Sequence, residues 1–113
     1  MKTGIIVFAH GSSVESANNA VRNVTARVAE LGGFPVMDTA FLEMARPDLP
    51  EAVDRMVASG VERIVVVPYF LTLGIHLKRD LPRIVNESAV KHPGLAIEVT
   101  EPLDGHPALA GIV

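Results

Sequence analysis

Three side chains able to bind a metal ion or move a proton recur at equal intervals along the chain. They are His10, Glu43 and His76, which lie 33 residues apart. Each follows a segment rich in apolar residues, as expected where a buried strand ends. In an open parallel sheet, ligands bind in the crevice outside the carboxyl ends of the strands. The spacing therefore predicts that all three side chains lie at this carboxyl edge of a sheet, where they could hold a metal ion or transfer protons.

Each of the three also has a simpler structural explanation. His10 can fill space in an ordinary strand–helix turn, because intermediate burial is common for histidine. Glu43 can be a solvated loop residue, and the loop before His76 can be buried at a contact between subunits. Two other histidines are weaker candidates. His106 follows the fourth predicted strand at the same edge, and His92 lies at the opposite edge.

The periodicity of the apolar residues predicts four strands that alternate with helices. The strands are predicted at residues 5–9, 35–42, 62–70 and 95–100. This alternation is typical of crossover units in a parallel sheet. The predicted fold is therefore α/β, an open four-stranded parallel sheet with helices on both faces. Residues 1–113 are expected to form a single domain, and the helix that begins at Pro107 is expected to be truncated.

The boundaries of the helices are predicted from their capping residues. Ser12 and Glu15 have the spacing of a capping box, so the first helix is expected to begin there. Asp48 is predicted to cap the second helix, and Pro82 is expected in the first turn of the third. The first helix is expected to bury one apolar stripe, formed by Ala17, Val21, Val24, Val28 and Leu31.

The composition excludes several classes of protein. The chain has 113 residues, of which 49% are hydrophobic, so it can bury a core and is not disordered. It contains no cysteine, so a metal ion would need His, Asp or Glu ligands. A net charge of −3 and 4% aromatic residues argue against a nucleic-acid partner. The apolar runs are far shorter than the roughly 20 residues of a membrane helix, and no secretory signal precedes them, so a cytoplasmic protein is expected.

The predicted carboxyl edge also carries residues suited to an acidic, partly apolar ligand. The candidates are Leu71, Leu73, Ile75, Arg46, Lys78, Arg79 and Arg83. The three apolar residues belong to a loop that is unusually apolar and could form the wall of a pocket. Ser12 is a further candidate, because backbone N–H groups at a helix start favour an anion. The alternative is that the basic residues form a solvated helix face.

Four segments of the chain resemble the short, single-unit CbiX-type sirohydrochlorin chelatases of the class II tetrapyrrole chelatase family. They are residues 8–12 (FAHGS), 41–47 (FLEMARP), 68–82 (PYFL through GIH to DLP) and 102–107 (PLDGHP). The resemblance spans nearly the whole chain, in order. It implies a chelatase-like α/β domain, equivalent to a flavodoxin-like half unit. One departure is Ser13, where many members carry a basic residue, and this puts a substrate contact from the first loop in doubt.

The resemblance implies insertion of Co²⁺ or Fe²⁺ into sirohydrochlorin, a carboxylated tetrapyrrole, in cobalamin or siroheme biosynthesis. It implies that His10 and His76 are metal ligands and that Glu43 assists them. The divalent metal would be a substrate, and no prosthetic group is expected. The tetrapyrrole carboxylates would meet the four basic residues named above, and its flat body the three apolar ones. The resemblance also implies a homodimer whose two sites face one another across the subunit contact.

Two other functions remain open from the sequence. In a histidine phosphatase, His10 would be the nucleophile and the backbone amides of residues 11–13 would bind phosphate. Such enzymes usually have an Arg just before the histidine, where this chain has Ala9. A carrier that binds metal or tetrapyrrole without joining them would use the same ligands. Imidazole ligands suit cobalt, iron and nickel alike, so neither the metal nor the pathway follows from the residues.

Overall fold

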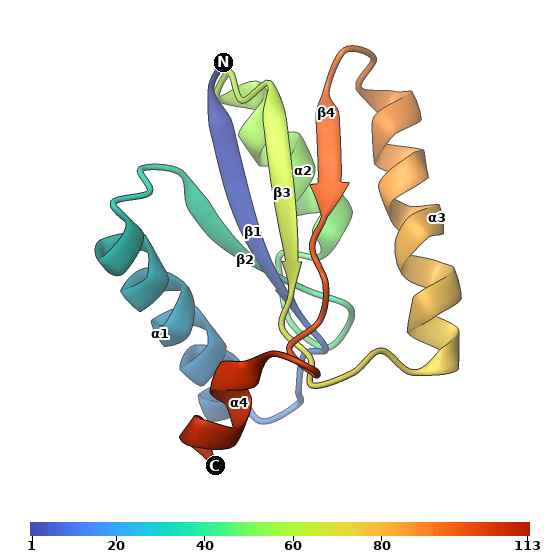
Figure 1. The fold of residues 1–113 in the computed structure, drawn as a ribbon. Coiled ribbons are helices and arrows are strands. Elements are labelled where there is room, and N and C mark those ends of the chain that lie inside the picture. Colours follow the sequence, from blue (N-terminus) through green and yellow to red (C-terminus); the bar gives the residue numbers. More distant parts are fainter.

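A computed structural model describes residues 1–113 and confirms the predicted α/β fold (Figure 1). The elements in chain order are β1 (Thr3–Ala9), α1 (Glu15–Gly32), β2 (Met37–Phe41), α2 (Leu49–Ala58), β3 (Arg63–Pro68), α3 (Ile75–Lys91), β4 (Ala96–Val99) and α4 (Pro107–Ile112). All strand pairs are parallel, and the order across the sheet is β2-β1-β3-β4. The last three strands are each shorter than predicted. No helix is both long and apolar enough to cross a membrane.

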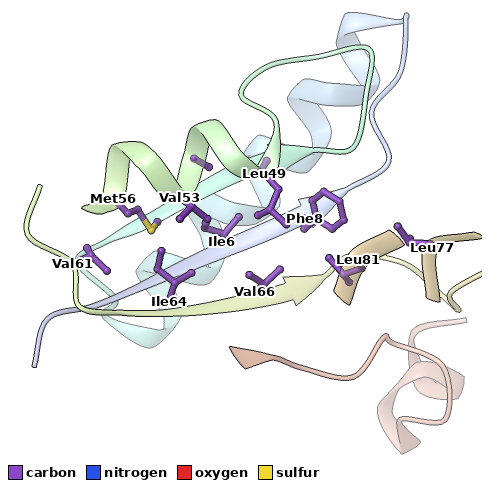
Figure 2. Packing of buried hydrophobic residues seen from close by; sticks show 12 residues of the cluster. Ile6, Phe8, Leu49, Val53, Met56, Val61, Ile64, Val66, Leu77 and Leu81 are labelled. Atoms are coloured by element: carbon purple, nitrogen blue, oxygen red, sulfur yellow. The ribbon is translucent and has the colours of Figure 1, made fainter. Parts of the chain in front are cut away.

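The main core lies between the sheet and one helical layer, formed by α2 and α3 (Figure 2). Ile6 and Phe8 of β1 and Ile64 and Val66 of β3 point into it, and none of the four is exposed to solvent. The helices contribute Leu49, Ala52, Val53, Met56, Leu77 and Leu81. Because alternate residues of a strand face opposite sides of the sheet, the neighbouring residues of β1 and β3 point to the side of the sheet on which α1 lies.

The face of the sheet on the α1 side is covered unevenly. Helix α1 lies over β2, so Val7 of the adjacent β1 is buried as well. As predicted, β1 is therefore buried on both faces. Farther from α1, Val65 and Val67 of β3 are only half-buried. The run of four aliphatic residues from Ile64 to Val67 thus forms a strand that is fully buried on one face only.

Two predicted details of α1 are wrong. No side chain caps α1, whose N-cap residue is Val14, because the Ser12 hydroxyl accepts a hydrogen bond from the Val14 N–H within the loop. In the predicted apolar stripe of α1, the side chains of Val28 and Leu31 are exposed. The buried residues of this helix are Asn18 and Thr25. Thr25 faces the sheet because its hydroxyl bonds to that of Thr39 in β2, at 2.7 Å.

Helix α3 also begins earlier than predicted from the position of Pro82, which was expected in its first turn. It starts at Ile75, so Pro82 lies inside the helix rather than in its first turn. The ring removes one helical hydrogen bond, to the Lys78 carbonyl, and the helix tolerates this loss because Leu77 and Leu81 anchor it to the core. The predicted cap of α2 is confirmed. Asp48 forms a capping box with Glu51, each side chain bonding to the other residue's backbone N–H.

An acidic residue of α2 ties this helix to the end of α3. Asp54 accepts hydrogen bonds from Lys91, at 2.8 Å, and from the His92 ring, at 2.7 Å. The bond from Lys91, and then that from His92, hold the pKa of Asp54 below its usual range. A carboxylate with a lowered pKa stabilises the fold above its unfolded-state pKa of about 3.9, and this contribution is lost as the pH falls through the folded-state value.

We expect Asp54→Asn to lower the free energy of unfolding at pH 7 by about 1 kcal/mol, a value limited by solvent screening. The difference from the unmodified chain should begin to shrink as the pH falls below about 4, where the carboxyl becomes protonated in the unfolded state, and should vanish only below the lower folded-state pKa. Urea unfolding at pH 7 and pH 3.5 measures it. The matched control is Glu30→Gln, which breaks an exposed pair with Arg27 and should change stability by less than about 0.5 kcal/mol. A deficit that persists undiminished at pH 3.5 contradicts this interpretation.

Candidate active site

The site lies at the carboxyl edge of the sheet, between the strands where the topology changes direction. From β1 the chain continues through α1 on one face, and from β3 through α3 on the other (Figure 1). Because β1 and β3 are neighbours, a crevice opens between their carboxyl ends. His10 directly follows β1, and His76 is the second residue of α3. Both therefore lie at the lower end of the sheet as drawn in Figure 1.

His10 and Glu43 are in direct contact. The Nε2 atom of His10 is 3.0 Å from Oε1 of Glu43. The backbone brings them together, because the β1–β2 pairing continues beyond the strands: Leu42 N–H donates to the Ala9 carbonyl at 2.9 Å and Glu43 N–H to the His10 carbonyl at 3.1 Å. The His10 and Glu43 side chains are 61% and 59% exposed, so both are open to a ligand.

A glycine makes this approach of the two loops possible. Gly11 has a φ of +92°, a conformation that residues with a Cβ rarely adopt. A Cβ at this position would lie 1.8 Å from the backbone carbonyl oxygen of Glu43. The first loop can therefore lie against the second only if residue 11 has no side chain.

The His10–Glu43 pair can do two kinds of chemistry. As a hydrogen-bonded pair, it can accept a proton from a ligand, with the carboxylate orienting the imidazole. As a metal-binding pair, it has a suitable separation, since bonds of about 2.1 Å at right angles place two ligand atoms about 3 Å apart. Imidazole nitrogen and carboxylate oxygen together suit a divalent first-row metal, and two protein ligands leave most coordination positions open.

His76 lies at the same edge but is not part of this pair. Its Nδ1 atom accepts a hydrogen bond from Nη2 of Arg79, one turn along α3, at 3.3 Å. No group of three or more His, Cys, Asp or Glu side chains lies close enough together to hold a metal ion. The structure therefore brings His10 and Glu43 together and leaves His76 separate. His106 is also engaged, because its Nδ1 accepts the Ala108 N–H and caps α4.

The loop after His10 is held by a buried asparagine. Asn18 of α1 is 1% exposed; its Oδ1 accepts the Ser12 N–H at 2.9 Å and its Nδ2 donates to the Ser12 carbonyl at 2.8 Å. The Ser12 hydroxyl accepts the Val14 N–H at 3.0 Å. Two of the N–H groups that an anion would need are thus already bonded, and Glu15 adds a negative charge in the first turn. This argues against the phosphatase alternative and against Ser12 as a substrate contact.

The four candidate basic residues have different environments. Arg46 pairs with Glu51 of α2, whose hydrogen bond raises the pKa of Arg46. Arg83 pairs with Glu87, farther along α3. Arg79 contacts Asp80 and His76, so among the four it is the one that is hydrogen-bonded to a candidate metal ligand. Lys78 lines a cavity of about 360 Å³ on the β4 side of α3, between this helix and residues 99–102.

Exposed apolar side chains follow the strands at the carboxyl edge. Among the predicted residues, Leu71 and Ile75 are 63% and 81% exposed, whereas Leu73 is half-buried against the core. The sequence analysis missed four others: Val14, Met44, Tyr69 and Leu103. Their position in or next to the loops that follow β1, β2, β3 and β4 is the signal that could have identified them. An apolar rim of six residues (Val14, Met44, Tyr69, Leu71, Ile75 and Leu103) therefore occupies these loops.

Comparison with known proteins identifies the family. A family model described as CbiX matches residues 4–113. The sirohydrochlorin cobaltochelatase of Methanopyrus kandleri is 37% identical over 81 residues, which are 72% of this chain and 57% of that protein. Among solved structures, a protein of Marinobacter aquaeolei described as a cobalamin (vitamin B12) biosynthesis CbiX protein has a TM-score of 0.86 and 32% identity, covering 97% of this chain and 89% of that one.

A second solved structure contains a metal. The sirohydrochlorin chelatase SirB from Bacillus subtilis subspecies spizizenii, in complex with cobalt, has a TM-score of 0.83 and 28% identity, covering 90% of this chain and 44% of that one. This chain thus spans about half the length of SirB and of the Methanopyrus kandleri protein. The family model, the shared fold and the order of the motifs agree, and the chain belongs to the CbiX family.

Proposed function

We propose that this chain is a sirohydrochlorin chelatase that inserts Co²⁺ or Fe²⁺ into the tetrapyrrole, in cobalamin or siroheme biosynthesis. The observation that carries the proposal is the contact between His10 and Glu43, 3.0 Å apart and open to solvent at the carboxyl edge. Membership of the CbiX family and the relatives named sirohydrochlorin chelatases support the same substrate.

In this proposal, His10 and Glu43 first hold the divalent metal as substrate, and His76 supplies a second imidazole from α3. The remaining positions on the metal are free for the nitrogens of the macrocycle. A closed set of four protein ligands would retain the metal, so an incomplete set favours its delivery. Two pyrrole protons must leave as the metal enters, and the Glu43 carboxylate and the imidazoles accept them.

The tetrapyrrole is proposed to lie on the apolar rim, with its carboxylates toward the basic residues of α3. Arg79 is the strongest candidate, because its Nη2 lies 3.3 Å from Nδ1 of His76. A substrate carboxylate that binds Arg79 would draw the guanidinium away from Nδ1 and free the imidazole for the metal. Arg83, Lys78 and Arg46 are secondary candidates, since Arg83 and Arg46 already have carboxylate partners and Lys78 lies on the β4 side.

We expect the double substitution of Arg79 and Arg83 by alanine to raise the KM for sirohydrochlorin about 10-fold, because charge-assisted hydrogen bonds to carboxylates are lost. Steady-state kinetics with sirohydrochlorin as the varied substrate measure this. Arg27→Ala is the control, since Arg27 is an exposed cation of α1 whose partner is Glu30. An unchanged KM in the double variant would exclude these two residues as substrate contacts.

One experiment separates the enzyme from a carrier of metal or tetrapyrrole. Purified protein is incubated with an excess of sirohydrochlorin and Co²⁺, or Fe²⁺ without oxygen, and the visible spectrum is followed. We expect the metallated product to exceed the protein concentration many times, at a rate proportional to protein. A spectral change that stops at one equivalent of protein indicates a carrier and rejects the chelatase proposal.

We further propose that the chain works as a homodimer in which the apolar rim faces a second copy. Val14, Leu71 and Ile75 are each more than half exposed, an arrangement that is costly in an isolated protomer. Leu71→Glu is expected to shift the chain from dimer to monomer in light scattering. Val90→Glu, at the opposite end of α3 and 79% exposed, is the matched control and should leave the dimer intact. A monomeric unmodified chain contradicts the proposal.

A further inference from the structure

A polar stripe on α1 faces strand β2 and the loops that carry His10 and Glu43. Asn18, Arg22 and Thr25 recur at intervals of four and three residues, so they lie on one face of the helix. Asn18 and Thr25 are buried, and the Arg22 side chain is 34% exposed. The predicted metal chemistry assigns no role to these residues, although burying polar side chains is costly unless they make hydrogen bonds.

Arg22 contacts both ends of the segment that contains Glu43. Its guanidinium carbon lies 5.1 Å from the centre of the Phe41 ring, the last residue of β2. Its Nη2 donates to the backbone carbonyl of Arg46 at 3.3 Å. Glu43 lies between these two residues, and its carboxylate is otherwise on an exposed loop. Arg22 thus restrains the segment on both sides of Glu43.

The same guanidinium is linked to the loop of His10 through a second carboxylate. Glu15 accepts hydrogen bonds from Arg22, at 2.5 Å, and from Asn18, at 3.0 Å. Asn18 in turn bonds to both backbone groups of Ser12, two residues after His10. The bonds from Asn18 and Arg22 lower the pKa of Glu15, so the carboxylate is charged at neutral pH. One network of Glu15, Asn18 and Arg22 therefore connects the two loops.

From this geometry we infer that Arg22 is a positioning residue, which holds the Glu43 loop so that the carboxylate faces His10. Asn18 does the same for the His10 loop, and Glu15 couples the two. The consequence for chemistry rests on the chelatase function proposed above. The restraint itself does not, because it concerns the separation of two side chains that would bind a metal ion whether or not a tetrapyrrole follows.

The test is a double-mutant cycle between Arg22 and Glu43. Arg22→Met keeps the apolar stem near Phe41 and removes the guanidinium. We expect it to lower kcat about 10-fold and to weaken Co²⁺ binding by a similar factor, as loss of a residue that orients a metal ligand does. The KM for sirohydrochlorin should change less than about 2-fold. In the Glu43→Gln background, Arg22→Met should have almost no further effect on either quantity, because interacting residues are not additive.

Two comparison variants exclude a general effect on folding. Arg27→Met removes an exposed arginine of the same helix that is paired with Glu30, and it should leave kcat and Co²⁺ affinity unchanged. Arg22→Lys keeps the charge but lacks the planar guanidinium whose two nitrogens bond to Glu15 and to the Arg46 carbonyl. It should therefore restore only part of the lost kcat. Thermal unfolding of each variant shows whether the chain is folded at the assay temperature.

The outcomes distinguish this inference from the proposed function. If Arg22→Met lowers Co²⁺ affinity equally in both backgrounds, or in neither, Arg22 does not act through Glu43 and the inference is overturned. If the unmodified chain binds Co²⁺ but never metallates sirohydrochlorin, the chelatase function fails. The cycle measured on Co²⁺ affinity still decides whether Arg22 positions Glu43.

Discussion

Replacing His10 by alanine is expected to lower the rate of Co²⁺ insertion at least about 100-fold and to weaken Co²⁺ binding strongly. The change removes the only imidazole in contact with Glu43 and leaves the metal to the Glu43 carboxylate and to His76, which is not in contact with it. It also removes a group that accepts protons from the macrocycle, and such groups contribute typically about 10²–10⁴-fold. Isothermal titration with Co²⁺ and initial rates with saturating sirohydrochlorin measure the two effects.

The control for this prediction is another histidine near the same edge. His106→Asn removes an imidazole but keeps a side-chain acceptor for the Ala108 N–H at the start of α4. It should leave Co²⁺ affinity and kcat within about 2-fold. Glu43→Gln is expected to have an intermediate effect, because the amide oxygen remains a weak ligand but cannot accept a proton. Full activity of the His10→Ala variant would remove the basis of the proposed metal site.

Gly11→Ala is expected to abolish chelation and to lower the free energy of unfolding by about 3 kcal/mol or more. Two costs combine at this position. The backbone has a φ of +92°, which an L side chain rarely adopts, and the new Cβ would lie 1.8 Å from the Glu43 carbonyl oxygen. The second cost can be relieved only by separating the two loops, which also separates Glu43 from His10. Thermal unfolding should show a decrease of about 12 °C or more.

Gly60→Ala is a matched control for the conformational part of this effect. Gly60 has a φ of +93°, but no atom lies within 4 Å of the position of its Cβ. We expect it to cost only about 1–2 kcal/mol and to leave kcat unchanged, because it follows α2 at the opposite edge of the sheet. Equal losses of stability and activity in the two variants would show that the contact with Glu43 is unimportant.

The elements and their order could be predicted because their signals are local. The aliphatic run from Ile64 to Val67, the Asp48 cap and the glycines after the first two helices each act within a few residues. Alternation of strands and helices then leaves few topologies, and the carboxyl edge follows from them. For the same reason, the candidate residues His10, Glu43 and His76 could be located at one edge before their contacts were known.

The contacts within the site depend on groups that are distant in the sequence. His10 meets Glu43 because Gly11 lets two loops touch, whereas His76 bonds to Arg79 and Arg46 to Glu51. Each contact is a competition between partners that only the folded chain brings within reach, so residue type cannot predict it.

Helix α1 shows the same limit in the core. Its apolar periodicity predicts a stripe that includes Val28 and Leu31, but both are exposed and Asn18 and Thr25 are buried. The hydrogen bonds to Ser12 and Thr39 determine how the helix is rotated against the sheet. Periodicity measures where a helix is apolar, and the orientation of that helix follows from the surface on which it packs.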